Sequence, residues 1–291
     1  MIPMWDKTVK WDSTIKPSHG WFDLNLKEIY KYRDLIWLLV MRNFKVFYKQ
    51  TILGPAWVVL QPLLTTVVFT VIFGNIAGLP TDGMPSFLFY MAGNIAWHYF
   101  SQCLTQTSNT FIQNRQIFGK VYFPRLIMPI STVFTQLINF AVQFAMFLVF
   151  LAFFAFDPES AVHPDWRLIL LTPLMLIQLA ALGLGFGIIV SALTTKYRDL
   201  AMLVSFGVQL WMYATPVTYS TSLIYDKIPS LAGLYMLNPM TPVIELFRSA
   251  YLGAEMTGMG YWGISWITTA VVLAIGIVLF TRIERTFVDT V

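Results

Sequence analysis

Residues 126–156 read LIMPISTVFTQLINFAVQFAMFLVFLAFFAF, a run of 31 residues that contains no Asp, Glu, Lys or Arg. A helix needs roughly 20 predominantly apolar residues to cross about 30 Å of hydrocarbon. This run is longer than an upright crossing requires. We therefore expect a transmembrane helix that extends beyond the bilayer, with Pro129 near its first turn.

The whole chain has a similar character. Hydrophobic residues make up 57% of it and charged residues only 12%, and its mean hydropathy is +0.64, which is more apolar surface than one soluble core could bury. The sequence therefore predicts an all-α membrane protein with six transmembrane helices. The six uncharged stretches of sufficient length are 56–77, 86–104, 126–156, 168–193, 200–219 and 263–281.

Basic residues indicate how these helices are oriented. Sixteen Lys and Arg residues fall in segments assigned to the cytoplasmic side and three in segments assigned to the outside. Residues 1–20 lack the apolar core of a secretory signal, so the first 55 residues are expected to stay inside. Both termini are therefore predicted to be cytoplasmic, and the sequence pI near 9.1 reflects topology rather than nucleic-acid binding.

The chain divides into three parts. Residues 1–55 form a cytoplasmic N-terminal segment, residues 56–282 the six-span transmembrane domain, and residues 283–291 a short cytoplasmic tail. Within 24–50, charged residues favour one helical face and apolar residues the other, which predicts a basic amphipathic helix on the inner leaflet. The charged positions are Lys27, Lys31, Asp34, Lys45 and Lys49, and the apolar ones are Ile29, Tyr30, Trp37, Val40, Phe44 and Phe47. A simple anchor and a helix that binds a partner or guides substrate are both open.

The six spans contain no Asp, Glu, Lys or Arg, and His98 is their only histidine. Carriers coupled to protons or ions usually keep ionisable groups at membrane depth, so this mode of transport has little support. No charged ring marks an ion filter, which disfavours an ion channel. We expect His98 to be a hydrogen-bonded packing residue, and Cys103, the only cysteine, to pack without a disulfide.

Uncharged polar residues recur at helical spacing. In the third span they are Thr132, Gln136, Asn139 and Gln143, and in the second they are Tyr90, Asn94, Trp97 or His98, and Ser101. Each stripe lies on one face of its helix. The stripes either join helices by hydrogen bonds within lipid or line a passage for a hydroxyl-rich cargo, and both interpretations remain open.

Catalysis within the chain is not indicated. Gly119-Lys120 is followed by Val121, and Asn114 stands where the first glycine of a phosphate-binding loop belongs, so the chain has no P-loop. Asp157, Glu159 and Asp165 lie on a short outer loop and are expected to be solvated surface rather than glycosidase carboxylates. No set of His, Cys, Asp and Glu has the spacing of a metal site.

Residues 118–129, FGKVYFPRLIMP, join the second and third spans on the predicted cytoplasmic side. They follow the sequence TQTSNTFIQNRQIF, which predicts a short amphipathic helix and a turn fixed by Pro124. Aromatic and arginine side chains supply much of the energy of protein interfaces. The segment is therefore either a knob that inserts into another protein or a basic loop with incidental aromatic residues.

Four segments, taken in order, resemble the permease subunit of the ABC-2-type polysaccharide exporters, which export O-antigen, capsule and teichoic acid. They are YKQTILGPAWVVLQPL (48–63), QNRQIFGKVYFPRLIMP (113–129), KYRDL (196–200) and LNPMTPVIELFRSAYLG (237–253). The resemblance covers roughly residues 25–282. It implies a homodimer of six-span permeases in the bacterial inner membrane, associated with two copies of a separate ATPase. That ATPase would bind ATP and Mg, with no cofactor in this chain, and the cargo would be an undecaprenyl-diphosphate-linked glycan.

The resemblance also implies roles for particular residues. The segment 113–125 would be the coupling helix and turn that dock on the ATPase, beside an interfacial helix at 26–50. Leu53 and Gly54 would lie near the lipid-pyrophosphate end of the substrate, and 220–253 would form short helices that gate the outer face. The coupling residues are Asn114, Arg115, Lys120, Tyr122, Phe123, Pro124 and Arg125. The translocation path would use Tyr90, Asn94, Trp97, Gln136, Asn139 and Gln143, and the outer gate Pro239, Glu245, Phe247 and Arg248.

The residues themselves add two expectations about packing. Glu245 and Arg248 are spaced to pair across one helical turn. Gly183, Gly187 and Ser191 recur every four residues, which allows close approach of another helix, in the same protomer or in a partner. Residues 1–23 extend beyond the region of resemblance and suggest no function.

The resemblance leaves other cargoes and other mechanisms open. An exporter of teichoic acid, capsule, phospholipid or a small molecule is the nearest alternative. A channel or carrier that works without ATP and a membrane-embedded glycan-processing enzyme are alternatives of a different class.

Overall fold

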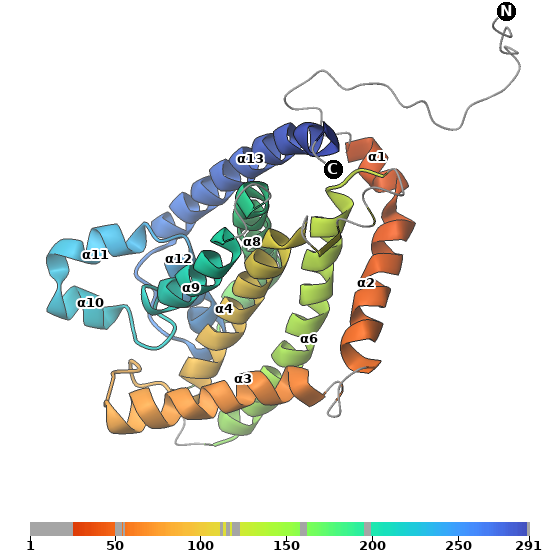
Figure 1. Ribbon diagram of the computed structural model, residues 1–291. Coiled ribbons are helices and arrows are strands. Elements are labelled where there is room, and N and C mark those ends of the chain that lie inside the picture. The colour runs from red at the N-terminus through yellow and green to blue at the C-terminus, as the bar shows by residue number, and fades with distance from the viewer. Residues whose placement is uncertain are drawn as a thin grey trace, which may run out of the picture.

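The computed structural model describes residues 26–49, 54, 56–110, 113, 114, 117, 123–157, 162–194 and 199–289. Every regular element in these ranges is a helix, which confirms the predicted all-α class. In Figure 1, α4 and α8 occupy the middle of the bundle, α2 stands beside α6 at one edge, and α10 and α11 project at the opposite edge.

Four helices in the described ranges are long and apolar enough to cross a membrane, namely α3 with its continuation η1, α6, α8 and α13. Their bounds are α3 Ala56–Phe69 with η1 Thr70–Ile76, α6 Ile127–Ala155, α8 Thr172–Thr194 and α13 Met259–Asp289. They correspond to the predicted first, third, fourth and sixth spans. The last is longer than predicted, because its helix continues into the segment expected to be a tail.

The other two predicted spans have a different form. Helix α4 (Ser86–Ser108) has 23 residues and is long enough to cross, but it is more polar than the four helices above. Helix α9 (Leu200–Tyr213) has 14 residues, about 21 Å at 1.5 Å per residue, and ends before the predicted residue 219. Pro216 explains the early end, because it disfavours helical geometry at Thr215 and offers no N–H of its own.

Helix α8 packs against α4 and α13 through glycines on two of its faces. A Cβ at Gly183 would lie 2.6 Å from the Cβ of Cys103, and one at Gly187 would lie 2.5 Å from the Cβ of Thr107. On the other face, Gly185 meets the backbone of α13, where Gly276 faces it in turn. The close approach predicted from the glycine spacing is confirmed, and it lies within one protomer.

The amphipathic helix is divided into α1 (Leu26–Lys31) and α2 (Arg33–Lys49). Leu39 is buried in a cluster with Phe123, Ile127 and Met128, so one side of α2 packs on the start of α6. The predicted apolar face is therefore only partly available to lipid. Its residues Tyr30 and Trp37 are 67% and 62% exposed, whereas Val40 is buried.

Three short helices lie between α9 and α13: α10 (Ser222–Lys227), α11 (Pro229–Met236) and α12 (Met240–Leu252). All residues of α12 are buried. Its rings Phe247 and Tyr251 pack against Phe144 and Phe147 of α6, with centroid separations of 5.4 to 6.1 Å. Helix α12 is therefore part of the core, whereas Leu231 and Leu234 of α11 are exposed. A further short helix, α7 (Trp166–Ile169), precedes α8.

Candidate functional site

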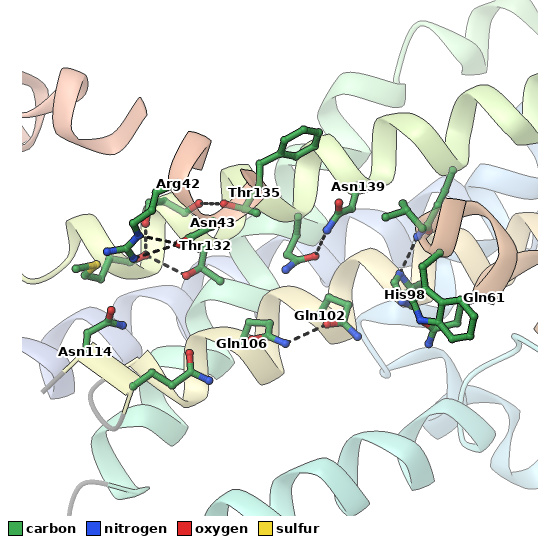
Figure 2. Close-up of a pocket in the computed structure, with 18 residues that line it drawn as sticks. Arg42, Asn43, Gln61, His98, Gln102, Gln106, Asn114, Thr132, Thr135 and Asn139 are labelled. Carbon is green, nitrogen blue, oxygen red and sulfur yellow. Dashed lines mark hydrogen bonds between the residues drawn. The ribbon is translucent and has the colours of Figure 1, made fainter. Parts of the chain in front are cut away.

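A cavity of about 550 Å³ lies between α2, α3, α4 and α6. Figure 2 shows it as an elongated space, with Arg42, Asn43 and Thr132 grouped at one end and His98 and Gln61 at the other. Gln102 and Gln106 of α4 lie between these ends. The cavity therefore follows the polar face of α4 along much of its length.

Carboxamide side chains dominate the lining. The described residues that line the cavity include six Gln and three Asn, no Asp or Glu, and Arg42 as the one Lys or Arg. The amides are Gln61, Gln102, Gln106, Gln113, Gln136, Gln143, Asn43, Asn114 and Asn139. A carboxamide both donates and accepts hydrogen bonds, so this lining suits an uncharged, hydroxyl-rich molecule.

Several of these amides make hydrogen bonds within the cavity wall, one between helices and two within a helix. Gln143 Nε2 lies 3.3 Å from His98 Nδ1, which joins α6 to α4. Asn139 donates to Gln136 at 3.0 Å, and Gln106 donates to Gln102 at 3.4 Å. The Oε1 atom of Gln143 is buried and has no hydrogen-bond partner among the described residues. The polar face is thus both a helix contact and a lining of the cavity.

The structure brings together half of the residues predicted for a translocation path. Gln136, Asn139 and Gln143 share a face of α6, as their spacing on the third span predicts, and that face lines the cavity. On α4, the side chains that line it are His98, Gln102 and Gln106, which succeed each other every four residues. The four-residue spacing from His98 to Gln106 is present in the sequence and could have identified this face. The polar stripe predicted for the second span included His98 only as an alternative to Trp97.

Tyr90, Asn94 and Trp97 lie elsewhere on α4 and do not line the cavity. Tyr90 meets the ring edge of Phe69, and Trp97 packs at 6.1 Å from Trp211. Asn94 donates a hydrogen bond to the carbonyl of Pro62 at 3.4 Å and so joins α4 to α3. These residues are buried in the core of the protomer. Tyr90 and Trp97 lie roughly a quarter-turn around α4 from His98, whereas Asn94 lies one helical turn from His98 and bonds to α3 instead of facing the cavity.

A second cavity, of about 530 Å³, lies among α10, α12 and the loops that precede α4 and α13. Its lining includes Asp82, Glu245, Arg248 and Thr257. The Asp82 carboxylate accepts hydrogen bonds from Ser220 and Ser222 beside α10. Thus the loop before α4 is bonded to the start of the short helices between α9 and α13.

The predicted pairing of Glu245 with Arg248 is wrong. Arg248 is 3% exposed and donates to three backbone carbonyls, those of Phe89, Pro216 and Val217, at 3.2, 2.5 and 2.7 Å. Glu245 Oε1 accepts from Thr257 at 2.8 Å. The helical spacing allows an ion pair, but the guanidinium instead donates to carbonyls in α4 and in the segment that follows α9.

Glu245 has an unusual environment. Burial raises the pKa of its carboxyl, while the hydroxyls of Thr221 and Thr257 and the charge of Arg248 oppose that rise. The other two residues predicted for the gate make packing contacts. Pro239 accepts a hydrogen bond from Ser265 at its carbonyl, and Phe247 belongs to the aromatic cluster with α6. These residues anchor α12 to α13 and to α6.

Comparison with known proteins decides the family. The profile of the ABC-2 type transporter family matches residues 34–252. The chain belongs to the ABC-2 type transporter family.

Three relatives extend the match. Two O-antigen export system permease proteins RfbA of Klebsiella pneumoniae are 27% and 28% identical over 256 and 261 residues, each covering 88% of this chain and 94% of the relative. The protein of the same name from Myxococcus xanthus is 31% identical over 227 residues, which are 78% of this chain and 83% of the relative. This ABC-2 chain is therefore similar to these permeases over nearly their whole length.

Of the coupling residues expected in this ABC-2 chain, four are described. Asn114 lines the amide cavity and donates to the carbonyl of Thr110 at 3.0 Å. Phe123 is buried against α2, and the carbonyls of Pro124 and Arg125 accept from Ile127 and Met128 at the first turn of α6. Arg115, Lys120 and Tyr122 lie outside the described residues.

The loop before α3 is described only at Gly54. Its φ of 51° lies in the left-handed region, and its carbonyl accepts from Trp57 at 3.3 Å. Glycine is therefore suited to this turn on conformational grounds, whatever the loop binds. Leu53 lies outside the described residues, as do residues 1–23.

Proposed function

We propose that this ABC-2 chain is the transmembrane permease subunit that exports an undecaprenyl-linked, O-antigen-like polysaccharide across the inner membrane. The amide-lined cavity between membrane helices is the observation that carries this proposal, because it offers a polysaccharide many donors and acceptors with almost no fixed charge. The names of the three relatives support polysaccharide export as the activity.

Hydrogen bonding of this kind suits a chain that must slide. Each sugar hydroxyl can exchange one amide for the next along α4 and α6, where Gln102, Gln106 and Gln136 follow one another. Because the lining has almost no fixed charge, it would not bind any one unit of a neutral glycan tightly. The cavity wall would then act as a passage rather than as a binding site of high affinity.

The proposed assembly is a homodimer of six-span chains with both termini in the cytoplasm, associated with two copies of a separate ATPase. The sequence has no P-loop, so ATP and Mg would be bound by that partner. In this arrangement α4 and the short α9 would supply the second and fifth spans, and the apolar exposed face of α9, with Met202, Leu203 and Phe206, would be covered by lipid or by the second protomer.

Export in cells tests the proposal. The chain would be expressed with its ATPase in a strain that makes the lipid-linked polysaccharide but lacks an exporter, and surface polysaccharide would be measured by immunoblotting. We expect surface polysaccharide only when both proteins are present and the ATPase retains its P-loop lysine. Export by this chain alone would indicate a channel or carrier. An intact complex that exports no polysaccharide would favour a phospholipid or small-molecule cargo.

A further inference from the structure

The second cavity, of about 530 Å³, is lined by two residues with buried polar atoms that the described part of the chain leaves unpaired. These atoms are Oε2 of Glu245 and Oγ1 of Thr221. Glu245 is 7% exposed and Thr221 is 5% exposed, so water reaches neither of them freely. A buried polar group without a partner is costly, and two such groups on one cavity therefore indicate a guest that bonds to both.

The two groups come from different elements and lie side by side. Glu245 belongs to α12, and Thr221 directly precedes α10. The Thr221 hydroxyl lies close enough to the Glu245 carboxyl to lower its pKa, but it does not reach hydrogen-bond geometry. The other carboxyl oxygen, Oε1, already accepts from Thr257 at 2.8 Å. That bond positions Glu245 and leaves Oε2 available to a ligand.

The rest of the cavity wall is formed before any ligand arrives. The Asp82 carboxylate accepts hydrogen bonds from Ser220 and Ser222, and Arg248 donates to three backbone carbonyls. Tyr225 adds an aromatic ring to the lining. A preformed cavity of this size, with apolar surface and a few fixed polar groups, is typical of small-molecule sites.

The charges of the lining indicate the class of ligand. The carboxylates of Asp82, Glu245 and Glu255 oppose an anion, and the nearby guanidinium of Arg248 opposes a cation. Among the described residues, no group of three His, Cys, Asp or Glu side chains is arranged to hold a metal ion. Hydroxyl side chains, which both donate and accept hydrogen bonds, make up much of the remaining lining. An uncharged molecule with neighbouring hydroxyls fits this lining best.

We propose that the second cavity binds one neutral sugar unit through Glu245 Oε2 and Thr221 Oγ1. This inference rests on the proposed polysaccharide function for its ligand class, and it adds a site that shares no lining residue with the amide cavity. The carboxylate would accept from one ring hydroxyl, and Thr221 would bond to the next. The loops around this cavity are those predicted to lie outside, so the sugar would be held after it has crossed the membrane. A uronic acid would be disfavoured by like-charge repulsion.

Photolabelling with diazirine-bearing methyl glucoside, galactoside and mannoside tests this assignment. The full chain, in complex with its ATPase in nanodiscs, would be labelled at a limiting concentration of each probe, and the labelled peptides would be identified by mass spectrometry. We expect at least one probe to label residues 220–225 or 253–257. The free parent hexose should compete with it, and the corresponding uronic acid should compete at least about tenfold less well.

Two threonine variants separate ligand binding from packing. Thr221→Val should lower the labelling about three- to tenfold, because one hydrogen bond to the sugar is lost. Its thermal stability should be unchanged or raised, because no described residue bonds to the hydroxyl that it removes. Thr241→Val is the matched control, since Thr241 is also buried with a hydroxyl that no described residue pairs, but it does not line the cavity. This control should be labelled like the unmodified chain.

Three results would overturn the assignment. The first is a lack of labelling at 220–225 and 253–257, which would leave the two polar atoms to bound water. The second is labelling that Thr221→Val does not change, and the third is equal competition by the hexose and its uronic acid. Export of polysaccharide in cells is measured separately. Failure of the unmodified complex to export would contradict the proposed function, whereas export without labelling at this cavity would contradict this inference alone.

Discussion

Arg248 shows how one residue can hold several elements together. Its guanidinium bonds to carbonyls of Phe89, Pro216 and Val217 and lies 3.5 Å from the centroid of the Phe89 ring. Gly93 gives it room, because a Cβ there would lie 2.5 Å from Nη2 of Arg248. A buried charge is costly unless it is satisfied, and here backbone dipoles and a ring face satisfy it.

Arg248→Met should therefore destabilise the chain by about 3 kcal/mol or more, because three buried carbonyls lose a charged donor. The measurement is thermal unfolding of the detergent-purified chain followed by intrinsic fluorescence. Arg167→Met is the control, since Arg167 is exposed. Equal losses of thermal stability in the two variants would contradict this account of Arg248.

Glu245 makes stability depend on pH. The pKa of its carboxyl is raised by burial, so the folded chain binds this proton more tightly than the unfolded chain does. Stability should then fall as pH rises from the ordinary pKa of glutamate through the raised value, and the loss is complete above it.

Glu245→Gln should remove this part of the pH dependence and raise the unfolding temperature at pH 8 relative to the unmodified chain. The amide oxygen keeps the hydrogen bond from Thr257. Unfolding temperatures at pH 5 and pH 8 are the measurement, and Glu255→Gln, at an exposed residue of the same cavity, is the control. A Glu245→Gln profile parallel to that of the unmodified chain would show that ionisation of Glu245 carries no such cost.

Helix α8 is the central element because two helices approach it closely at once. Gly183 and Gly187 admit α4, and Gly185 admits α13 on the opposite side. In lipid, apolar side chains gain little from leaving the solvent, so close van der Waals contact and hydrogen bonds have to hold helices together. Gln178 of α8 contributes hydrogen bonds to α13: its side chain accepts from Trp262 at 2.7 Å and donates to Ser265 at 2.6 Å.

Gly187→Ala should destabilise the bundle by roughly 1–3 kcal/mol, because its Cβ would lie 2.5 Å from Thr107 Cβ and 3.0 Å from the carbonyl oxygen of Leu104. Gly207→Ala on α9 is the matched control, since no atom lies within 4 Å of its added Cβ. That substitution should be neutral or stabilising by up to about 1 kcal/mol through helix propensity. Thermal unfolding of both variants is the measurement, and a Gly187→Ala chain as stable as Gly207→Ala would contradict the packing argument.

At the scale of the whole molecule, described residues of the proposed coupling segment contact the amide-lined cavity and the helices around it. Phe123 packs with Leu39 of α2 and Ile127 of α6, and Asn114 lines the cavity itself. Because packed side chains move as a unit, a push on residues 113–125 would be transmitted to both walls of the cavity. Phe123 thus has a structural role within this chain in addition to any role at an interface.

Arg125→Glu should uncouple the proposed complex, since it reverses a charge within the proposed docking segment 113–125. We expect polysaccharide export to fall more than about tenfold while the chain remains inserted and the ATPase still hydrolyses ATP. Surface polysaccharide and ATP hydrolysis are measured together, with Arg167→Glu as the control. Normal export together with normal co-purification of the ATPase would remove Arg125 from the coupling surface.

The local sequence was sufficient to predict the helical class and four of the spans. The third span has no charged residue over 31 positions. The hydrocarbon core requires each spanning helix to be apolar along its own length, so a span can be recognised from its own residues. The spacing of Gly183 and Gly187 is also a local property of one helix. It predicts a face where another helix can approach closely, but not which helix does so. The amide stripe from Gln136 to Gln143 also belongs to one helix, so its spacing predicts a shared face, and the structure places that face on the cavity.

Only the tertiary structure decided which faces meet. His98 and Gln102 of α4 line the cavity, whereas Tyr90, Asn94 and Trp97 of the same helix are buried in the core. Arg248 donates to three backbone carbonyls and does not pair with Glu245. The tertiary structure also placed Arg42, remote in sequence from Gln143, at the end of the same space. Periodicity fixes the side chains that share a helix face, but the rotation of one helix against another is set by packing among residues far apart in the chain.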